Sequence, residues 1–246
     1  MRTFGLIGFP LGHSFSRKYF TEKFTREGIS DTDYLLFEIP EIEEVGAVVE
    51  KHPDLCGFNI TIPYKEQIFP FLNELDAAAK AIGAVNVVKI IDGKLKGYNT
   101  DFVGFRDSLQ DFLGSAKPQK ALILGTGGAS KAVAYALQSM GIAYHYVSRT
   151  AKNGSISYGQ LHESPHWIKD HHLIVNTTPL GTYPNTEDHP DIPYEMLGEE
   201  HYLYDLVYNP AVTSFMKSGK QNGTKVSNGY DMLIRQAEAA WDIWNS

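Results

Sequence analysis

Two residues in the first half of the sequence have side chains that could move a proton. Lys65 ends the segment Asn59-Ile60-Thr61-Ile62-Pro63-Tyr64-Lys65, and Asp101 ends Gly97-Tyr98-Asn99-Thr100-Asp101. An ammonium group that is oriented by a carboxylate can give a proton to a developing alkoxide, or accept one in reverse. An arbitrary pair of this kind is more often a surface salt bridge, and spacing alone does not bring the two side chains together.

A glycine-rich loop lies downstream, between the apolar run 121–124 and a helical pattern. In such a turn the backbone N–H groups approach a pyrophosphate closely, and the helix N-terminus adds partial positive charge. The candidate cofactor contacts are Gly125, Thr126, Gly127, Gly128 and Ala129, with Ser130 at the place of the usual third glycine or alanine. An ordinary strand-to-helix turn is the alternative. A nicotinamide held here would move a hydride, so the loop and the Lys/Asp pair together indicate oxidation or reduction of an alcohol carbon.

The residues about 20 positions beyond the loop favour a phosphorylated dinucleotide. Ser148-Arg149-Thr150 stands where NAD enzymes carry an acidic residue for the ribose 2′-hydroxyl, and Lys152 adds positive charge. Arginine can bind a 2′-phosphate bidentately, whereas a carboxylate would repel it. The sequence therefore predicts NADP rather than NAD, although an arginine at a strand end is often only solvated.

Several short polar side chains gather near the N-terminal strands. Ser14 and Ser16 open a helix and suit a carboxylate ligand, although plain N-capping is the alternative. Thr61 and Asn86, with Asn59, suit the recognition of hydroxyl groups but equally suit ordinary turns. His13 is a weaker candidate, because a histidine beside glycine in a loop is usually structural.

The elements that must position these residues alternate between strand and helix. Strands are predicted at 3–8, 34–39 and 56–62, and helices at 16–27, 40–51, 72–81 and 101–113. Residues 84–91 and 94–98 are predicted to form a hairpin around Asp92-Gly93, because both turn residues tolerate positive φ. This order implies an α/β fold with a mostly parallel sheet.

A second βα pattern follows the best linker candidate in the chain, Gly114 to Pro118. It comprises strands at 121–124, 143–148, 173–176 and 202–207, a helix from about 130 to 140, and a final amphipathic helix at 231–244. This half is predicted to be the dinucleotide-binding fold.

Composition excludes several classes of protein. In 246 residues, 43% are hydrophobic and 21% charged, so we expect a packed core. The net charge of −7 argues against a general nucleic-acid binder. One cysteine excludes an internal disulfide, and no Cys/His spacing typical of zinc is present. Without a signal-peptide pattern or an apolar stretch of membrane-spanning length, we expect a cytoplasmic protein with no membrane partner.

With these residues in hand, the chain resembles the shikimate dehydrogenases over nearly its whole length. The matching segments run in order through the sequence: Gly8 to Ser16, Asn59 to Lys65, Gly83 to Asn86, Gly97 to Asp101, Gly125 to Lys131, Asn176 to Gly181, and Asn228 to Leu233 followed by Gln236. Each motif is short, but seven in the correct order are highly specific.

The resemblance implies two domains and a reaction. A substrate-binding and catalytic domain would comprise residues 1–101 and 227–246, and a Rossmann-type NADP-binding domain residues 102–226. The implied activity is the reversible NADPH-dependent reduction of 3-dehydroshikimate to shikimate, a step of chorismate and aromatic amino acid biosynthesis. It needs no metal, and the protein would be a monomer or a homodimer.

The resemblance also implies a role for each matched residue. Lys65 and Asp101 would form the catalytic pair, with Lys65 supplying the proton at C3 and Asp101 orienting it. Ser14 and Ser16, with Tyr208, would hold the substrate carboxylate, and Thr61, Asn86, Asp101 and Gln236 its hydroxyls. Thr177 would contact the cofactor, and Gly229 and Met232 would lie beside the nicotinamide.

Some positions depart from the family pattern, and other functions remain open. Arg17 replaces a proline that often follows the second serine, Ser148 an asparagine, and Asn153 a residue that is often basic. An NAD-dependent quinate/shikimate dehydrogenase is the near alternative. A noncatalytic sensor of shikimate-like acids is a second, and a folate dehydrogenase with a lysine-bearing domain is a remote third.

Overall fold

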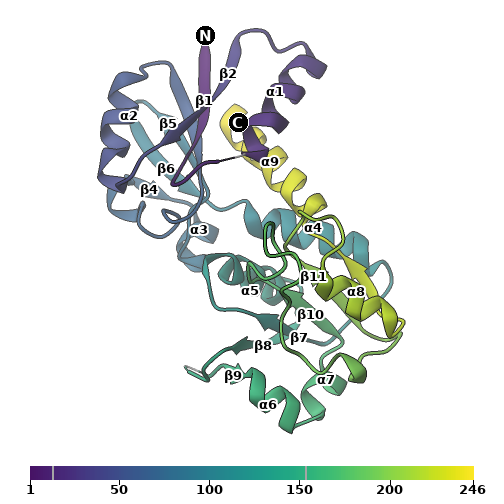
Figure 1. Cartoon of the computed structure of the whole chain (residues 1–246). Helices are drawn as coiled ribbons and strands as arrows, with labels where there is room; N and C mark the ends of the chain where they lie inside the picture. Colours follow the sequence, from purple (N-terminus) through teal and green to yellow (C-terminus); the bar gives the residue numbers. More distant parts are fainter. Residues whose placement is uncertain (13, 153) are drawn as a thin grey trace. The chain divides into compact units, whose positions relative to one another are not determined.

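The computed structural model of the protein describes residues 1–12, 14–152 and 154–246, and the chain divides into two compact units. The first unit contains Met1–Thr100 and Gln236–Ser246, and the second contains Asp101–Arg235 (Figure 1). The division falls at the first residue of helix α4 (Asp101–Leu113) and inside helix α9 (Tyr230–Asn245). The sequence-based proposal places it after residues 101 and 226.

The first unit is built on one mixed sheet. Its elements are β1 (Arg2–Gly8), α1 (Phe15–Glu27), β2 (Thr32–Glu38), η1 (Ile42–Glu44), α2 (Val45–Lys51), β3 (Leu55–Ile60), η2 (Phe69–Phe71), β4 (Glu74–Leu75), α3 (Ala77–Ile82), β5 (Val87–Ile91) and β6 (Lys94–Tyr98). The strand order is β2-β1-β3-β5-β6-β4. β1 pairs in parallel with β2 and β3, whereas β5 runs antiparallel to both β3 and β6.

Both faces of this sheet are covered, because side chains alternate along each strand. On one face Phe4 and Val87 pack with Phe20 of α1 and Trp244 of α9. On the other face the core cluster includes residues of η1, α2 and α3. Figure 1 shows α1 and the end of α9 side by side over the sheet. The hairpin turn has positive φ at Asp92 (49°) and Gly93 (74°), as its sequence predicts.

The predicted helix at 72–81 is wrong for its first five residues. The N–H of Asn73 donates to the carbonyl of Leu95, and the Leu95 N–H donates to Asn73 Oδ1. This pairing draws Glu74–Leu75 into the sheet beside β6. Helix α3 starts only at Ala77, where Asp76 accepts hydrogen bonds from the N–H groups of Ala78 and Ala79.

The second unit contains a sheet in which every pairing is parallel. Its elements are α4, β7 (Lys120–Leu124), α5 (Gly128–Ser139), β8 (Ala143–Ser148), β9 (Ile156–Ser157), α6 (Tyr158–Glu163), α7 (His166–Asp170), β10 (Leu173–Asn176), η3 (Tyr194–Met196), β11 (Tyr202–Asp205), α8 (Ser214–Gln221), β12 (Lys225–Ser227) and the start of α9. The strand order β9-β8-β7-β10-β11-β12 is the 3-2-1-4-5-6 order of a Rossmann fold.

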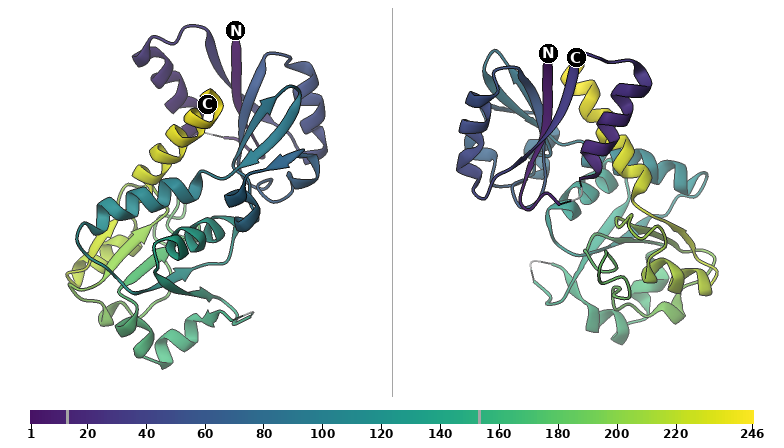
Figure 2. Two further views of the ribbon diagram at one scale, coloured as in Figure 1. Left: turned by 180° about the vertical axis from the view of Figure 1, so that it is seen from behind. Right: turned by 45° about the horizontal axis from the view of Figure 1, so that its top comes forward.

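Helices cover both faces of this second sheet, which explains why β7 is a continuous apolar run. Ala121 and Ile123 pack with α4 and α5, which lie together over one face (Figure 2). Leu122 and Leu124 pack on the other face with Leu161 of α6, among others. The predicted linker 114–118 is wrong as a domain boundary, because it lies inside this unit.

Candidate functional site

In the first unit, polar side chains meet where β3 and β5 are paired. Asn59 is 5% exposed and lies inside β3, and Asn86 is 3% exposed and immediately precedes β5. Asn59 Nδ2 donates to the Asn86 carbonyl oxygen at 3.2 Å. Thr61 directly follows β3, and its N–H donates to the carbonyl of Ile7 in β1. The sheet register therefore fixes the positions of all three residues.

Asn86 is the centre of a buried hydrogen-bond network. Its Nδ2 donates to Thr100 Oγ1 at 3.0 Å and to Gln236 Oε1 at 3.4 Å. Its Oδ1 accepts from the Thr100 N–H at 2.6 Å. The network thus brings Asn86 together with Gln236, which is distant in sequence and reaches this unit on α9. Amide groups that both donate and accept suit the recognition of substrate hydroxyls.

The same network continues to helix α1 through a tyrosine. The Tyr34 hydroxyl donates to Asn59 Oδ1 at 2.7 Å. Tyr34 is almost fully buried, which raises the pKa of its hydroxyl, and a hydrogen bond from the Ser16 side chain opposes that rise. Ser16, Asn86 and Gln236 therefore belong to one connected set of contacts.

Helix α1 begins at the serine pair and is held against α9 at its other end. Ser14 is the N-cap of α1, because its Oγ accepts from the Arg17 N–H at 3.3 Å. Lys23 is 5% exposed, and its ammonium donates to Glu238 of α9 at 2.8 Å. The Tyr19 hydroxyl donates to the same carboxylate. These bonds fix the helix that carries both serines.

Lys65 lies in the turn after β3, and its backbone is tightly held. The N–H of Val85, the residue before Asn86, donates to the Lys65 carbonyl at 2.8 Å. The neighbouring Tyr64 hydroxyl bonds to the carbonyls of Ile39 and Pro40, each at 2.7 Å. The Lys65 side chain is half-buried.

Asp101 opens helix α4 and is 8% exposed. Its peptide bond to Thr100 attaches it directly to a residue that Asn86 binds. Lys65 and Asp101 fall on opposite sides of the division between the units. The network therefore brings Asn86, Thr100 and Gln236 together.

In the second unit, the glycine loop follows β7 at the point where the strand order reverses. Gly125 has φ of +105°, and a Cβ there would lie 2.9 Å from Thr177 Oγ1. Thr177, which follows β10, donates to the Leu124 carbonyl from both its N–H and its Oγ1. Only glycine fits this close approach without strain. In open α/β sheets this reversal is where ligands bind.

The loop leads into α5 with backbone donors at its start. Gly127 is the N-cap of this 12-residue helix and makes no side-chain cap, and α5 begins at Gly128 rather than at Ser130. Ser130 is buried, and its hydroxyl bonds back to the Gly127 carbonyl at 2.6 Å. Thr126 is exposed and Ala129 half-buried. A helix start of this kind fits the pyrophosphate of a dinucleotide.

The predicted 2′-phosphate contacts follow β8 directly in the chain. Arg149, Thr150 and Lys152 are all exposed. Ser148 Oγ donates to the Thr150 carbonyl at 2.6 Å and contacts Ser155 Oγ at 3.0 Å. Two exposed cations on a held backbone fit a phosphate group.

The remaining predicted residues follow β11 and β12 or lie on α9. Tyr208 follows β11 and is 38% exposed, and partial burial raises the pKa of its hydroxyl. The Gly229 N–H donates to the Val207 carbonyl at 3.4 Å. Met232 is 8% exposed and packs in the core cluster that includes Phe105 of α4.

Sequence reasoning missed Tyr34, Thr100 and Asp205. Tyr34 lies in an apolar run that gives no sign of a polar role. Thr100 could have been found from its place beside Asp101 in a matched motif. Asp205 is a lone acid in the buried strand run Tyr202–Val207 and is 0% exposed, which is an available signal.

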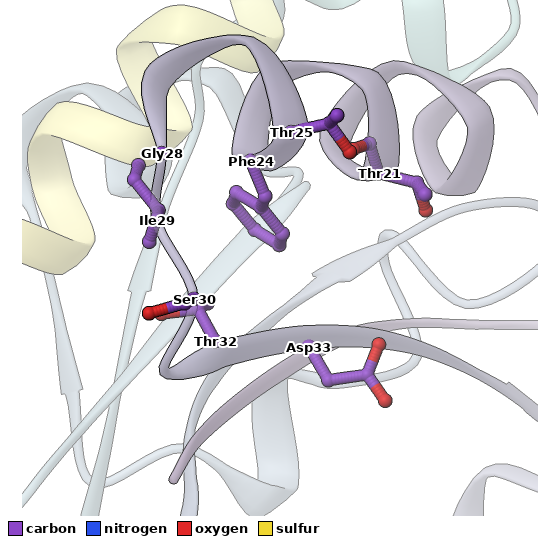
Figure 3. A pocket seen from close by; sticks show the side chains of 8 residues that line it. All are labelled: Thr21, Phe24, Thr25, Gly28, Ile29, Ser30, Thr32 and Asp33. Atoms are coloured by element: carbon purple, nitrogen blue, oxygen red, sulfur yellow. The ribbon is translucent and has the colours of Figure 1, made fainter.

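A cavity of about 400 Å³ lies at the far end of α1 from Ser14 and Ser16 (Figure 3). It is lined by Thr21, Phe24, Thr25, Gly28, Ile29, Ser30, Thr32 and Asp33. The hydroxyls of Thr21 and Thr25 already donate to backbone carbonyls of α1. None of the predicted site residues lines this cavity.

His13 and Asn153 lie outside the described residues. Over the remainder of the chain, no cluster of three or more His, Cys, Asp or Glu side chains is arranged to hold a metal ion. In the same part of the chain, no helix combines the length and apolarity needed to cross a membrane.

Residues 6–88 match the family described as the shikimate dehydrogenase substrate binding domain. The shikimate dehydrogenase (NADP(+)) of a Methanococcus maripaludis strain is 37% identical, over 98% of this chain and 90% of that protein. The structure of shikimate 5-dehydrogenase from Thermus thermophilus in complex with NADP(H) and shikimate is 31% identical with a TM-score of 0.85, over 99% of this chain and 93% of that one.

A quinate dehydrogenase from Corynebacterium glutamicum in complex with NAD is also similar, at 25% identity and a TM-score of 0.87, over 99% of this chain and 93% of that chain. The identity to the curated relative extends through both units, and the second sheet has the Rossmann strand order. The chain therefore belongs to the shikimate dehydrogenase family.

Proposed function

We propose that this protein catalyses the reversible reduction of 3-dehydroshikimate to shikimate with NADPH, a step of aromatic amino acid biosynthesis. The observation that carries the proposal is 37% identity over 98% of the chain to a shikimate dehydrogenase (NADP(+)). The buried Asn86 network in one unit and the glycine loop at the strand reversal in the other agree with it.

Substrate binding is assigned to the domain predicted as residues 1–101 and 227–246. Ser14 and Ser16 open α1 and bind the substrate carboxylate, with Tyr208 as a further contact. Thr61, Asn86, Asp101 and Gln236 bind the hydroxyls. The hydrogen bond between Asn86 and Gln236 supports this assignment, because it orients two amides toward a common region.

Proton transfer is assigned to Lys65 and Asp101. During reduction, the Lys65 ammonium gives a proton to the oxygen that develops negative charge at C3, and it takes that proton back during oxidation. Asp101 orients the ammonium group. The backbone bond between Val85 and Lys65 supports the role, because it ties the lysine to the segment that carries Asn86.

Cofactor binding is assigned to the domain predicted as residues 102–226, with Gly229 and Met232 beside the nicotinamide. NADPH supplies the hydride when it is bound. Gly125 to Ala129 bind the pyrophosphate through backbone N–H groups, with Thr177 supporting the loop. Ser148 and Thr150 shape the loop from which Arg149 and Lys152 contact the 2′-phosphate. We further propose a cytoplasmic monomer or homodimer that uses no metal.

The decisive experiment is a steady-state assay with shikimate and quinate, each with NADP and NAD. We expect turnover of shikimate with NADP to be the fastest of the four combinations. Faster turnover of quinate with NAD would favour an NAD-dependent quinate/shikimate dehydrogenase, a second candidate that the likeness to the Corynebacterium enzyme supports. Shikimate binding without turnover would favour a sensor, and no binding of shikimate would contradict the proposal.

A further inference from the structure

The last residues of three neighbouring strands lie in one row at the carboxyl edge of the second sheet. Leu124 of β7 pairs with Asn176 of β10, which pairs with Asp205 of β11. The glycine loop starts directly after Leu124, and Thr177 directly after Asn176. Asp205 is 0% exposed, and the proposed reaction gives it no role.

The Asp205 carboxylate accepts three hydrogen bonds, all from neutral donors. Oδ1 accepts from Asn176 Nδ2 at 2.9 Å and from the Val207 N–H at 3.1 Å. Oδ2 accepts from Thr213 Oγ1 at 2.6 Å. Burial raises the pKa of this carboxyl to about 6, and the three hydrogen bonds oppose that rise. Among the described residues, no cationic group bonds to this carboxylate, and a buried charge without such a partner is costly. This cost indicates a purpose beyond stability.

On one side, the carboxylate controls the loop that supports the glycine turn. Because Asn176 donates to Asp205 through Nδ2, its Oδ1 is directed to Thr178. There it accepts from the Thr178 N–H at 3.0 Å and from Thr178 Oγ1 at 2.7 Å. A Cβ on Gly125 would lie within 3.0 Å of both Thr177 Oγ1 and Thr178 Cγ2. The orientation of one amide therefore sets the surface against which the pyrophosphate loop packs.

On the other side, the carboxylate holds the segment that leads to Tyr208. Its bond to the Val207 N–H fixes the backbone there. The Val207 carbonyl then accepts from the Gly229 N–H at 3.4 Å, at the start of α9. Asp205 thus lies between the two groups of residues to which we assign the pyrophosphate and the nicotinamide.

We propose that Asp205 is a positioning residue of the cofactor site, whose carboxylate holds the Thr177–Thr178 loop and the Val207–Tyr208 segment in register. The inference rests on the proposed function, because it takes this edge of the sheet as the NADP site. Ionisation matters because all three partners are donors. A protonated carboxyl presents one donor and an amide presents two, and among the three partners only the Thr213 hydroxyl can rotate to accept.

The test compares Asp205→Asn with Thr213→Val by calorimetric titration with NADP at about pH 8. Asp205→Asn keeps the shape but replaces charge-assisted bonds by weaker neutral ones, so we expect NADP affinity to fall about tenfold. Thr213→Val removes the bond to Asp205 Oδ2. It also removes the N-cap of α8, in which Thr213 Oγ1 accepts from the Met216 N–H. It leaves the Asn176 and Val207 bonds, so it should lower Tm yet keep NADP affinity within about twofold.

A second readout separates positioning from packing. Among the described residues that bond to Asp205, Asn176 on β10 and Thr213 beside α8 are neutral. Tyr194 on η3 also faces Asp205. Burial is the main cause of the raised pKa of the Tyr194 hydroxyl, and the charge of Asp205 is the next. As pH falls through about 6, wild-type Asp205 is protonated and comes to resemble the amide. The ratio of the NADP dissociation constants of Asp205→Asn and the wild type should therefore approach one. The titration of the NADP 2′-phosphate affects both constants equally and cancels in that ratio.

Equal NADP affinity of the wild type and Asp205→Asn at about pH 8 would overturn the inference. A ratio that does not change with pH would do the same, because packing alone does not titrate. A wild-type protein that binds no NADP would overturn the proposed function itself and the inference with it. That outcome is visible before any variant is made, so the two failures are distinguishable.

Discussion

At the scale of single residues, the site depends on amides and carboxylates whose hydrogen-bond directions are fixed. Asn86 donates to Thr100 Oγ1 and Gln236 Oε1 and accepts from the Thr100 N–H. The amide of Asn86 donates through Nδ2 and accepts through Oδ1. Rotating it by 180° would exchange these two atoms and place a donor against a donor. The substrate region that we propose is therefore built before any substrate arrives, and binding need not pay to order these side chains.

Lys65→Ala should abolish most turnover while shikimate still binds. Loss of a positioned proton donor lowers kcat by roughly 10²-fold or more, whereas the substrate contacts that we propose lie on other residues. Steady-state kinetics and shikimate titration measure the two effects. Lys80→Ala is the matched control, because Lys80 is exposed on α3. A variant that keeps near-normal kcat would rule out proton transfer by Lys65.

Relative to the wild type, Asp205→Asn should gain stability as pH rises. The pKa of Asp205 is raised by burial to about 6, above its unfolded value of 3.8, so the native state holds the proton more tightly. The cost of ionising it is absent below about pH 4 and complete above about pH 6, where it amounts to about 3 kcal/mol. Urea unfolding of the wild type and Asp205→Asn across this pH range measures the difference between their unfolding free energies. A difference in unfolding free energy that stays constant with pH would contradict it.

At the scale of elements, patterns predicted strands and helices well where apolar periodicity decides the structure. The helix at 101–113 and the strands at 143–148 and 173–176 have the predicted bounds. The start of α3 was missed because Asn73 pairs with Leu95, a contact that no local pattern encodes. The short elements β9, α6 and α7 were also missed, since two to six residues carry too little periodicity.

The candidate site was predictable where it follows strand ends and motifs, and not where it depends on register. Spacing was enough to propose the glycine loop and Arg149, because the loop directly follows β7 and Arg149 directly follows β8. It could not show that Tyr34 links Ser16 to Asn59, because that contact joins two strands and a helix. Tertiary pairing, rather than propensity, determines such contacts.

Gly125→Ala should impair the loop far more than the same change at a comparable glycine. Gly125 has φ of +105°, and an added Cβ would lie 2.9 Å from Thr177 Oγ1. Strain of about 1–3 kcal/mol, together with this contact, should lower NADP affinity by tenfold or more. Gly141→Ala is the control, because Gly141 has φ of +73° with no atom within 4 Å of the new Cβ. Calorimetric titration measures affinity, and equal affinities for the two variants would contradict the prediction.

At the scale of the whole molecule, the chain leaves the first unit at Thr100 and returns to it at Gln236. Each unit has its own buried clusters, and α9 contributes Met232 to one and Ala237 and Trp244 to the other. The apolar periodicity of α9 runs through residues 235 and 236 without a break. Sequence pattern therefore had no signal for the point of division inside this helix.

Two ligands should stabilise two different sets of backbone amides. If NADP binds the second unit, it should slow hydrogen exchange in β7, β8 and β10, and shikimate should slow exchange in β3 and β5. At about 100 times its dissociation constant, a ligand adds about 2.7 kcal/mol, which is close to a hundredfold slowing of globally exchanging amides. Exchange measured by mass spectrometry resolves these peptides. If either ligand protected both sheets equally, the two units would unfold as one cooperative unit, and the prediction of two separately protected sets of amides would be wrong.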